Sequence, residues 1–179
     1  MTRLKALNPA DATGKTKELF NAVESKLGSV PNMMRTMGNA PAVLEGYLNL
    51  SGALSHGILG GKTGELIALT VAQNNACDYC LAAHSFIGEK LVKIDSESIH
   101  AARLGNAHDS KTNAILQFAK TLVNKSGLVN DQDVNAAKAS GLSEAEIAET
   151  VAHVALNILT NYFNNTANTE IDFPQVAAL

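Results

Sequence analysis

Segments rich in helix-forming residues recur along all 179 residues of this chain, and most of them are closed by a glycine. Alanine, leucine, glutamate and lysine favour helix, whereas the alternating β-branched runs that favour strands are almost absent. A glycine after such a segment can adopt the left-handed conformation that ends a helix. The pattern predicts an all-α fold, a compact multi-helix domain.

Prolines, glycines and capping residues set the expected helix boundaries. Ser143 and Glu146 match a capping box, which predicts the start of a last long helix reaching about residue 164. The stretch GILGGKTG at 57–64 is expected to be a flexible connector. The other expected helices cover residues 13–27, 32–37, 41–55, 65–75, 78–92, 95–104, 110–125 and 130–139. The first of these is expected to bury Leu19, Phe20, Val23 and Leu27.

Length and composition indicate one domain over residues 1–179, with a cysteine-containing core at about 41–125. A hydrophobic content of 46% is sufficient for a continuous core. The net charge of −3, from 14 basic and 17 acidic residues, provides no basic surface for nucleic acid. The N-terminal twenty residues lack the apolar region of a secretory signal, so we expect a cytoplasmic protein. The most apolar run, VAHVALNILTNYF, is too short and too polar for a membrane span.

Both cysteines of the chain lie in the stretch ACDYCLAAH, at positions 77 and 80, and His84 ends the stretch. On a helix, the spacing i, i+3 and i+7 places Cys77, Cys80 and His84 on one face. With Cys77 at the start of the helix, free backbone amides point at its sulfur and favour the thiolate, the nucleophilic form. In a reducing compartment, a close pair of this kind is typical of redox, catalytic or metal-binding sites.

Glu65 is a candidate partner for His84. A tight turn near Ala76 would fold the helix that carries Glu65 back along the helix that carries His84. At about 1.5 Å per residue, the two side chains would then lie within roughly one helical turn of each other. A carboxylate beside an imidazole orients the ring and favours its protonated form, which gives a relay for proton transfer.

The spacing of Glu65, Cys77, Cys80 and His84 resembles the active-site motif of the alkylhydroperoxidase D-like, peroxidase-related branch of the carboxymuconolactone decarboxylase family. The C-terminal stretch NYFNNTANTEIDFP is also similar to that of peroxidase-related members. The resemblance implies an all-helical homo-oligomer, a trimer or hexamer, that reduces hydroperoxides with no haem, flavin or metal cofactor.

In the mechanism that the resemblance implies, Cys80 is the peroxidatic thiol and Cys77 the resolving thiol. Glu65 and His84 move the proton, and an external dithiol reduces the resulting disulfide. The chain departs from some members, which have a histidine where Tyr79 stands. Because a tyrosine is no base near neutral pH, a relay in this protein has to omit that position.

Alternatives remain open from the sequence alone. The cysteines could be buried structural thiols, or could hold zinc together with His84 and Glu65. The protein could be a redox-sensing dithiol protein, or a cofactor-free decarboxylase or lactone-processing enzyme like the namesake of the family. His56, His100, His108 and His153 are expected to be solvated or satisfied within the core, and the methionines Met33, Met34 and Met37 to fill the core.

Asn157, Asn161 and Asn164 form an amide stripe on the last helix. We expect this stripe to make hydrogen bonds between helices or between subunits.

Overall fold

The computed structural model describes residues 1–179 and consists of helices and loops, with no strand. The all-α prediction is therefore confirmed. The helices are α1 (Gly14–Leu27), α2 (Asn32–Met37), α3 (Pro41–Leu54), α4 (Gly60–Asn74), α5 (Asp78–Ile87), the π-helix η1 (Gly88–Val92), α6 (Ser96–Arg103), α7 (Ser110–Asn124), α8 (Asp131–Ala139) and α9 (Glu144–Ala167).

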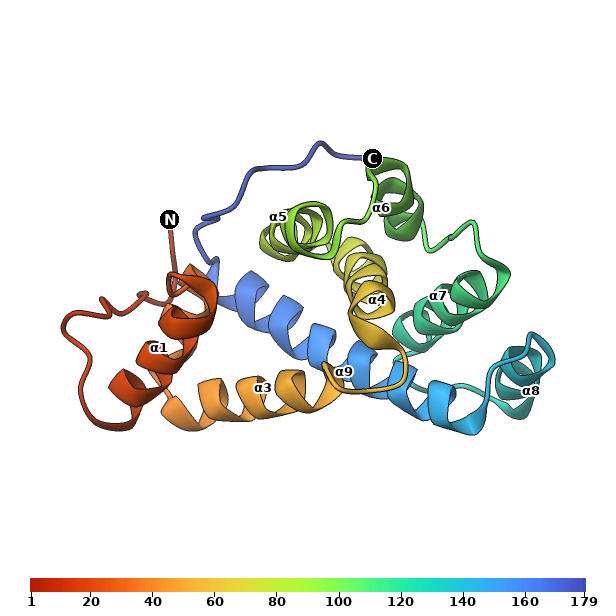
Figure 1. Ribbon diagram of the computed structural model, residues 1–179, viewed down its shortest axis with the longest axis horizontal. Helices are drawn as coiled ribbons and strands as arrows, with labels where there is room; N and C mark the ends of the chain where they lie inside the picture. The colour runs from red at the N-terminus through yellow and green to blue at the C-terminus, as the bar shows by residue number, and fades with distance from the viewer.

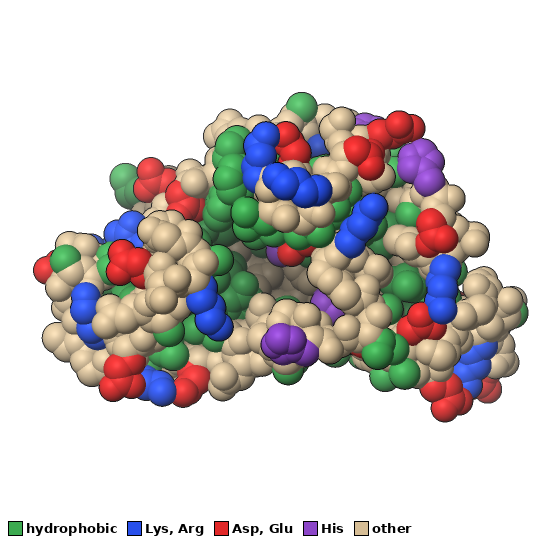
Figure 2. Space-filling view, in the orientation of Figure 1, with side chains coloured by type: hydrophobic (Ala, Val, Ile, Leu, Met, Phe, Trp, Pro, Cys, Tyr) green, Lys and Arg blue, Asp and Glu red, His purple; other side chains and the backbone are tan.

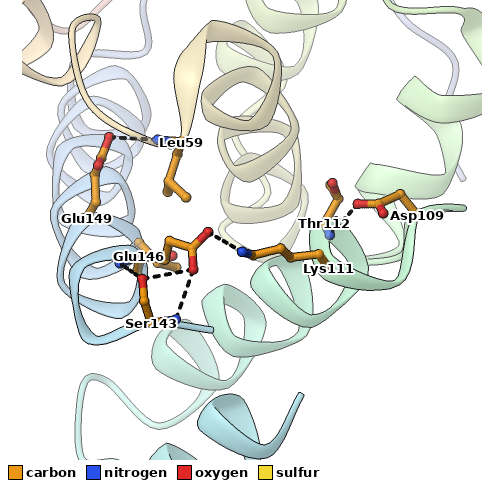
Figure 3. A network of polar contacts seen from close by, with 8 residues as sticks. Leu59, Asp109, Lys111, Thr112, Ser143, Glu146 and Glu149 are labelled. Carbon is orange, nitrogen blue, oxygen red and sulfur yellow. Dashed lines mark hydrogen bonds and ion pairs between the residues drawn. The ribbon is translucent and has the colours of Figure 1, made fainter. Parts of the chain in front are cut away.

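Side-chain caps define where several helices begin. The predicted capping box is present at the start of α9, where Ser143 and Glu146 each bond to the other's backbone amide. Figure 3 shows this box together with Lys111 of α7, whose Nζ lies 2.8 Å from the Glu146 carboxylate. The contact with Lys111 holds the pKa of Glu146 down at about 2. In the same view, Asp109 caps α7 by accepting a hydrogen bond from the backbone of Thr112.

Helix α4 lies at the centre of the molecule and packs against α5, α6, α7 and α9. Its residues from Leu66 to Ala72 are all buried, as expected for a helix that is apolar on every face. Helix α9 runs along one side of the molecule, with α1 and α3 toward one end and α7 and α8 toward the other (Figure 1). This arrangement leaves α4, α5 and α9 facing α1, α2 and α3.

The C-terminal segment leaves α9 at Asn168 and passes over α5 toward α6 (Figure 1). Asp172 accepts a hydrogen bond from the backbone amide of Asn32, at the start of α2, at 2.8 Å. The ring of Phe173 contacts Tyr79 edge-on, with 5.8 Å between ring centroids, and lies at the same distance from the ring of Phe86. The segment therefore packs against the face of α5 that carries Tyr79 and Phe86.

The predicted boundaries fail in one functionally relevant place, the connector at 57–64. Helix α4 already begins at Gly60, so only the first part of this stretch is a loop. The reason is a long-range contact: the carboxylate of Glu149 accepts hydrogen bonds from the backbone amides of Ile58, at 2.8 Å, and Leu59, at 3.3 Å. Figure 3 shows the bond from Leu59. These bonds hold the loop and fix the start of α4.

Smaller differences concern the ends and faces of helices. The helix expected over 78–92 changes from α to π geometry at Gly88. Leu27, expected to be buried on α1, is 51% exposed, whereas Phe20 and Val23 are buried as expected. Helix α9 extends to Ala167, beyond the expected end, because Asn168 adopts the left-handed conformation that closes it.

Candidate active site

The cysteine motif is positioned by a tight turn between α4 and α5. Ala76 has a φ of 47°, in the left-handed region, and the backbone amide of Cys77 donates to the carbonyl of Ala72 at 3.0 Å. The chain therefore reverses within a few residues, as predicted, and α5 packs against α4. The turn places Cys77 at the N-cap of α5 and Cys80 in its first turn.

Cys77 and Cys80 form a disulfide bond, and their Cα atoms are 5.3 Å apart. The sulfur of Cys77 accepts a hydrogen bond from the backbone amide of Cys80 at 3.3 Å. This is the contact expected of a cysteine at a helix start, where amide hydrogens stabilise a thiolate. Both side chains are almost completely buried from bulk solvent, with relative exposures of 0% for Cys77 and 2% for Cys80.

The predicted pairing of Glu65 with His84 is confirmed as a direct contact. Nδ1 of His84 lies 2.7 Å from Oε2 of Glu65, and the two side chains are 22% and 19% exposed. The contact joins α4 to α5 across the hairpin, one turn beyond Cys80. Because an ionised carboxylate only accepts hydrogen bonds, Nδ1 carries a proton and Nε2 is the nitrogen left to exchange one.

A cavity of about 610 Å³ opens beside these groups, between α1, α2 and α3 on one side and α4, α5 and α9 on the other. Figure 2 shows the molecule hollowed at this place, with hydrophobic side chains around the opening. Glu65, Cys80 and His84 line the cavity, whereas Cys77 does not. Apolar parts of the wall include Met33, Met34, Leu48, Phe86, Leu156 and Phe173.

The methionines near the N-terminus and the histidines outside the motif divide between the core, the cavity wall and the surface. Met33, Met34 and Met37 belong to the hydrophobic core, as expected, and the first two also face the cavity. His56, His100 and His108 are exposed. His153 is buried and lines the cavity, so its surroundings differ from those of the other three.

Asn164 of α9 is a site residue that the sequence did not identify. Its Nδ2 donates a hydrogen bond to the sulfur of Cys80 at 3.3 Å, and its side chain is buried. A donor at this distance stabilises negative charge on sulfur. The amide stripe on the last helix was expected to bond between helices. This expectation is confirmed for Asn161, which accepts from Asn75 at 3.0 Å, but the contact with sulfur was not foreseen.

Two tyrosines of the site stay protonated. Burial raises the pKa of Tyr79, and its hydroxyl oxygen accepts a hydrogen bond from the backbone amide of Met33 at 3.1 Å. Burial also raises the pKa of Tyr47 to about 12, and the negative charge of Glu65 adds to the effect. Tyr79 thus links α5 to α2 through this hydrogen bond, which is a structural role for the tyrosine between the two cysteines.

No group of three or more His, Cys, Asp or Glu side chains is arranged to hold a metal ion. None of the helices combines the length and the apolar character that a membrane crossing requires.

Comparison with known proteins places the motif in a family. The model of the carboxymuconolactone decarboxylase family matches residues 41–120, the segment that contains Glu65, both cysteines and His84. This segment of the chain is therefore similar to the family, and the resemblance inferred from the motif is confirmed over these residues. No curated protein matches the chain.

Solved structures extend the likeness in fold over nearly the whole chain. An uncharacterized peroxidase-related protein from Ralstonia eutropha JMP134, described as an alkylhydroperoxidase AhpD core, has a TM-score of 0.84 and 23% identity, over 96% of this chain and 92% of that one. A peroxidase-related protein from Silicibacter sp. TM1040 has a TM-score of 0.80 and 23% identity, over 95% and 94% of the two chains.

A third similar structure is a cysteine-to-alanine variant of the debrominase Bmp8 in complex with 2,3,4-tribromopyrrole. It has a TM-score of 0.79 and 20% identity, over 96% of this chain and 92% of the other. At these identities, the three structures establish the shared fold.

Proposed function

We propose that this protein is a thiol-dependent peroxidase, in which Cys80 attacks a hydroperoxide and Cys77 resolves the product as a disulfide. The observation that carries the proposal is the convergence of one cavity-lining sulfur, a partner cysteine within bonding distance, and a Glu65–His84 pair. The match to the family model and the peroxidase-related structural neighbours support the same chemistry.

The choice between the two sulfurs depends on access. Amide capping favours a thiolate at Cys77, but Cys77 is fully buried and does not line the cavity. Cys80 does line it, and Asn164 supplies a hydrogen bond to its sulfur. Because a peroxide must reach the attacking sulfur, Cys80 is the peroxidatic thiol in our proposal. The amide bond to Cys77 then favours the thiolate needed for the second step.

In the first step, the Cys80 thiolate attacks the terminal oxygen of ROOH. An S–O bond forms, the O–O bond breaks, and the alkoxide leaves as ROH after it takes a proton from Nε2 of His84. In the second step, the Cys77 thiol gives up its proton and its sulfur attacks the sulfenic acid sulfur. An S–S bond forms, the S–O bond breaks, and the hydroxide leaves as water after it takes that proton. An external dithiol then reduces the disulfide by exchange and becomes oxidised itself.

Glu65 has two roles in this scheme. Its carboxylate holds the His84 ring with Nδ1 toward α4, so that Nε2 is free for the proton transfer. It also stabilises the imidazolium that forms when His84 takes the thiol proton before the attack. The mostly apolar cavity excludes bulk water from the sulfur and accommodates an organic group on the peroxide.

Stoichiometric oxidation tests the proposal. One equivalent of hydroperoxide, added to the fully reduced protein, should consume both thiols, lower the protein mass by two hydrogens and release one equivalent of ROH. A reducing dithiol should then restore turnover. Disulfide formation without turnover by any dithiol would favour the redox-sensing alternative, and activity that survives loss of both cysteines would favour a decarboxylase or lactone-processing enzyme.

Reductive dehalogenation is a second candidate, favoured by the structural likeness to the debrominase Bmp8. The Cys80 thiolate would attack the halogen of a halogenated aromatic ring, so that an S–halogen bond forms, the C–halogen bond breaks and the ring carbon takes up a proton. The Cys77 thiolate would then attack the Cys80 sulfur, an S–S bond would form, and the halogen would leave as halide. Bromide release from 2,3,4-tribromopyrrole, measured beside hydroperoxide reduction, distinguishes the two substrates.

A further inference from the structure

His153 of α9 is the buried histidine that the peroxidase scheme leaves unused. Its relative exposure is 8%, it lines the same cavity as Cys80, and its Nε2 has no hydrogen-bond partner. The ring lies against Gly64, where an added Cβ would come within 2.9 Å of its Cε1 atom. Glycine at this position of α4 is thus what leaves room for an imidazole in the cavity wall.

Glu149, one turn before His153 on α9, lies on the Nε2 side of the ring. Nε2 of His153 is 3.8 Å from Oε1 of Glu149, beyond hydrogen-bond distance. The carboxylate itself is fixed by the backbone amides of Ile58 and Leu59. Gly57 makes this approach feasible, since a Cβ there would overlap the carboxylate of Glu149. The loop before α4 is therefore built around this carboxylate.

The negative charge of Glu149, 3.8 Å from Nε2, favours the proton of a neutral His153 ring on that nitrogen. Burial lowers the pKa of His153, and the charges of Glu149 and Glu65 oppose this effect only in part. The ring is accordingly neutral near pH 7. Nδ1 is then an acceptor, and it has no hydrogen-bond partner in the chain. Unlike Nε2, it is not completely buried.

The distance between this nitrogen and the thiol sets the length of a ligand. His153 and Asn164 are eleven residues apart on α9, about three turns, so they share one face of the helix. At 1.5 Å per residue they are roughly 16 Å apart along the axis, and Asn164 contacts the Cys80 sulfur. If this axial spacing is taken as the scale of the span from Nδ1 to the sulfur, contacts of about 3 Å at each end leave roughly 10 Å for the ligand. Asn157 and Thr160 line the cavity between the two ends.

We propose that Nδ1 of His153 is the acceptor of a polar subsite, which holds a hydroxyl group at the far end of a hydroperoxide whose O–O group lies at Cys80. The inference rests on the proposed peroxidase function and specifies its substrate class: a compact, mainly apolar hydroperoxide, about as long as a para-substituted benzene, with a neutral hydroxyl opposite the peroxide. A carboxylate is disfavoured there, because Glu149 and Glu65 are both close to His153.

Binding of inert alcohols tests the subsite independently of peroxidase activity. The probes are 2-phenyl-2-propanol and its 4-hydroxy and 4-carboxy derivatives, followed through the side-chain ¹⁵N resonances of histidine-labelled protein. The 4-hydroxy alcohol should bind about 10-fold more tightly than the parent, a typical effect of one hydrogen bond, and should shift the Nδ1 resonance of His153. An unmoved Nδ1 resonance, equal affinities, no binding of either alcohol, or tighter binding of the carboxylate would each overturn the subsite.

Substrate preference provides the second test, with cumene hydroperoxide and its 4-hydroxy derivative. The wild type should favour the hydroxylated substrate about 10-fold in kcat/KM, mainly through KM. His153→Leu should abolish the preference, whereas His153→Asn, which keeps an acceptor near the position of Nδ1, should retain part of it. The matched control His108→Leu changes a histidine that is 66% exposed and should retain all of it. If His153→Leu still prefers the hydroxylated hydroperoxide, the subsite is refuted. If the wild type reduces neither hydroperoxide, the proposed peroxidase function is refuted instead, and the alcohol-binding experiment alone then tests the subsite.

Discussion

The substitution Glu65→Gln tests whether the Glu65–His84 pair works as a proton relay. Glutamine keeps the size of the side chain and one hydrogen-bonding oxygen, so the fold and the Cys77–Cys80 disulfide should be retained. What is lost is the charge that stabilises the imidazolium of His84. The reaction of the thiol with hydroperoxide should therefore slow down.

The structure allows the loss to be estimated. The 2.7 Å contact joins side chains that are about one-fifth exposed, so an effective dielectric of about 20 is appropriate. Unit charges centred about 4 Å apart then interact by about 4 kcal/mol. At 1.36 kcal/mol per decade, the rate should fall by about 10³-fold. This value lies within the range of about 10² to 10⁴ found when a positioned acid or base is removed.

The measurement is the second-order rate of thiol oxidation by hydroperoxide as a function of pH. The rate of the variant should recover partly toward high pH, where solvent removes the proton from the thiol without help from the relay. Glu97→Gln is the matched control, since Glu97 forms a surface pair with His108 at 3.5 Å and is 81% exposed. Superimposable profiles for wild type and Glu65→Gln would refute the relay and leave Glu65 with a structural role.

Further perturbations test the roles of the two cysteines, the need for a metal, the approach of Glu149 to Gly57, and the ion pair of Glu146. Cys80→Ser should abolish peroxide consumption, whereas Cys77→Ser should still react once and stop at a sulfenic acid or a mixed disulfide; sulfenic acid trapped at Cys77 in the Cys80→Ser variant would reverse the assignment. Chelation should change neither helicity nor peroxide turnover, and stoichiometric zinc whose removal unfolds the protein would support the zinc alternative instead. Gly57→Ala should lower the free energy of unfolding by about 1–3 kcal/mol in a urea titration, because the added methyl group overlaps Glu149; an unchanged midpoint would contradict the tight approach. The pKa of Glu146 is lowered from 4.5 to about 2, so the contribution of its carboxylate to stability is present above pH 4.5 and is lost as pH falls toward 2. Glu146→Gln should flatten this part of the curve of unfolding free energy against pH. Parallel curves for wild type and variant would show that the contacts of Glu146 with Lys111 and Ser143 do not stabilise the fold.

Features that depend on near neighbours in the chain were predictable. The capping box of Ser143 and Glu146 and the turn at Ala76 are encoded within a few residues, as is the common face of Cys77, Cys80 and His84. The geometry of the Glu65–His84 pair followed from this turn and the rise of a helix. Short-range sequence patterns were therefore sufficient to predict the geometry of the α4–α5 hairpin.

Features that depend on the packing of α9 were not predictable in the same way. The start of α4 at Gly60 requires a carboxylate, Glu149, that lies some ninety residues away in the sequence. Asn164 was recognised as part of an amide stripe, but its bond to Cys80 depends on how α9 crosses α5. His153 lies in an apolar run, where no neighbouring residue in the sequence indicates a binding or catalytic partner. Its place in the cavity wall is what distinguishes it from a histidine of the core.

The cavity is assembled from two parts of the chain. Glu65, Cys80 and His84 lie within the segment 41–120 that matches the family model, whereas much of the opposite wall comes from flanking segments, including Met33 and Phe173. Substitutions in the flanking wall would therefore change the shape of the space offered to a ligand without altering the hairpin that carries the reactive groups.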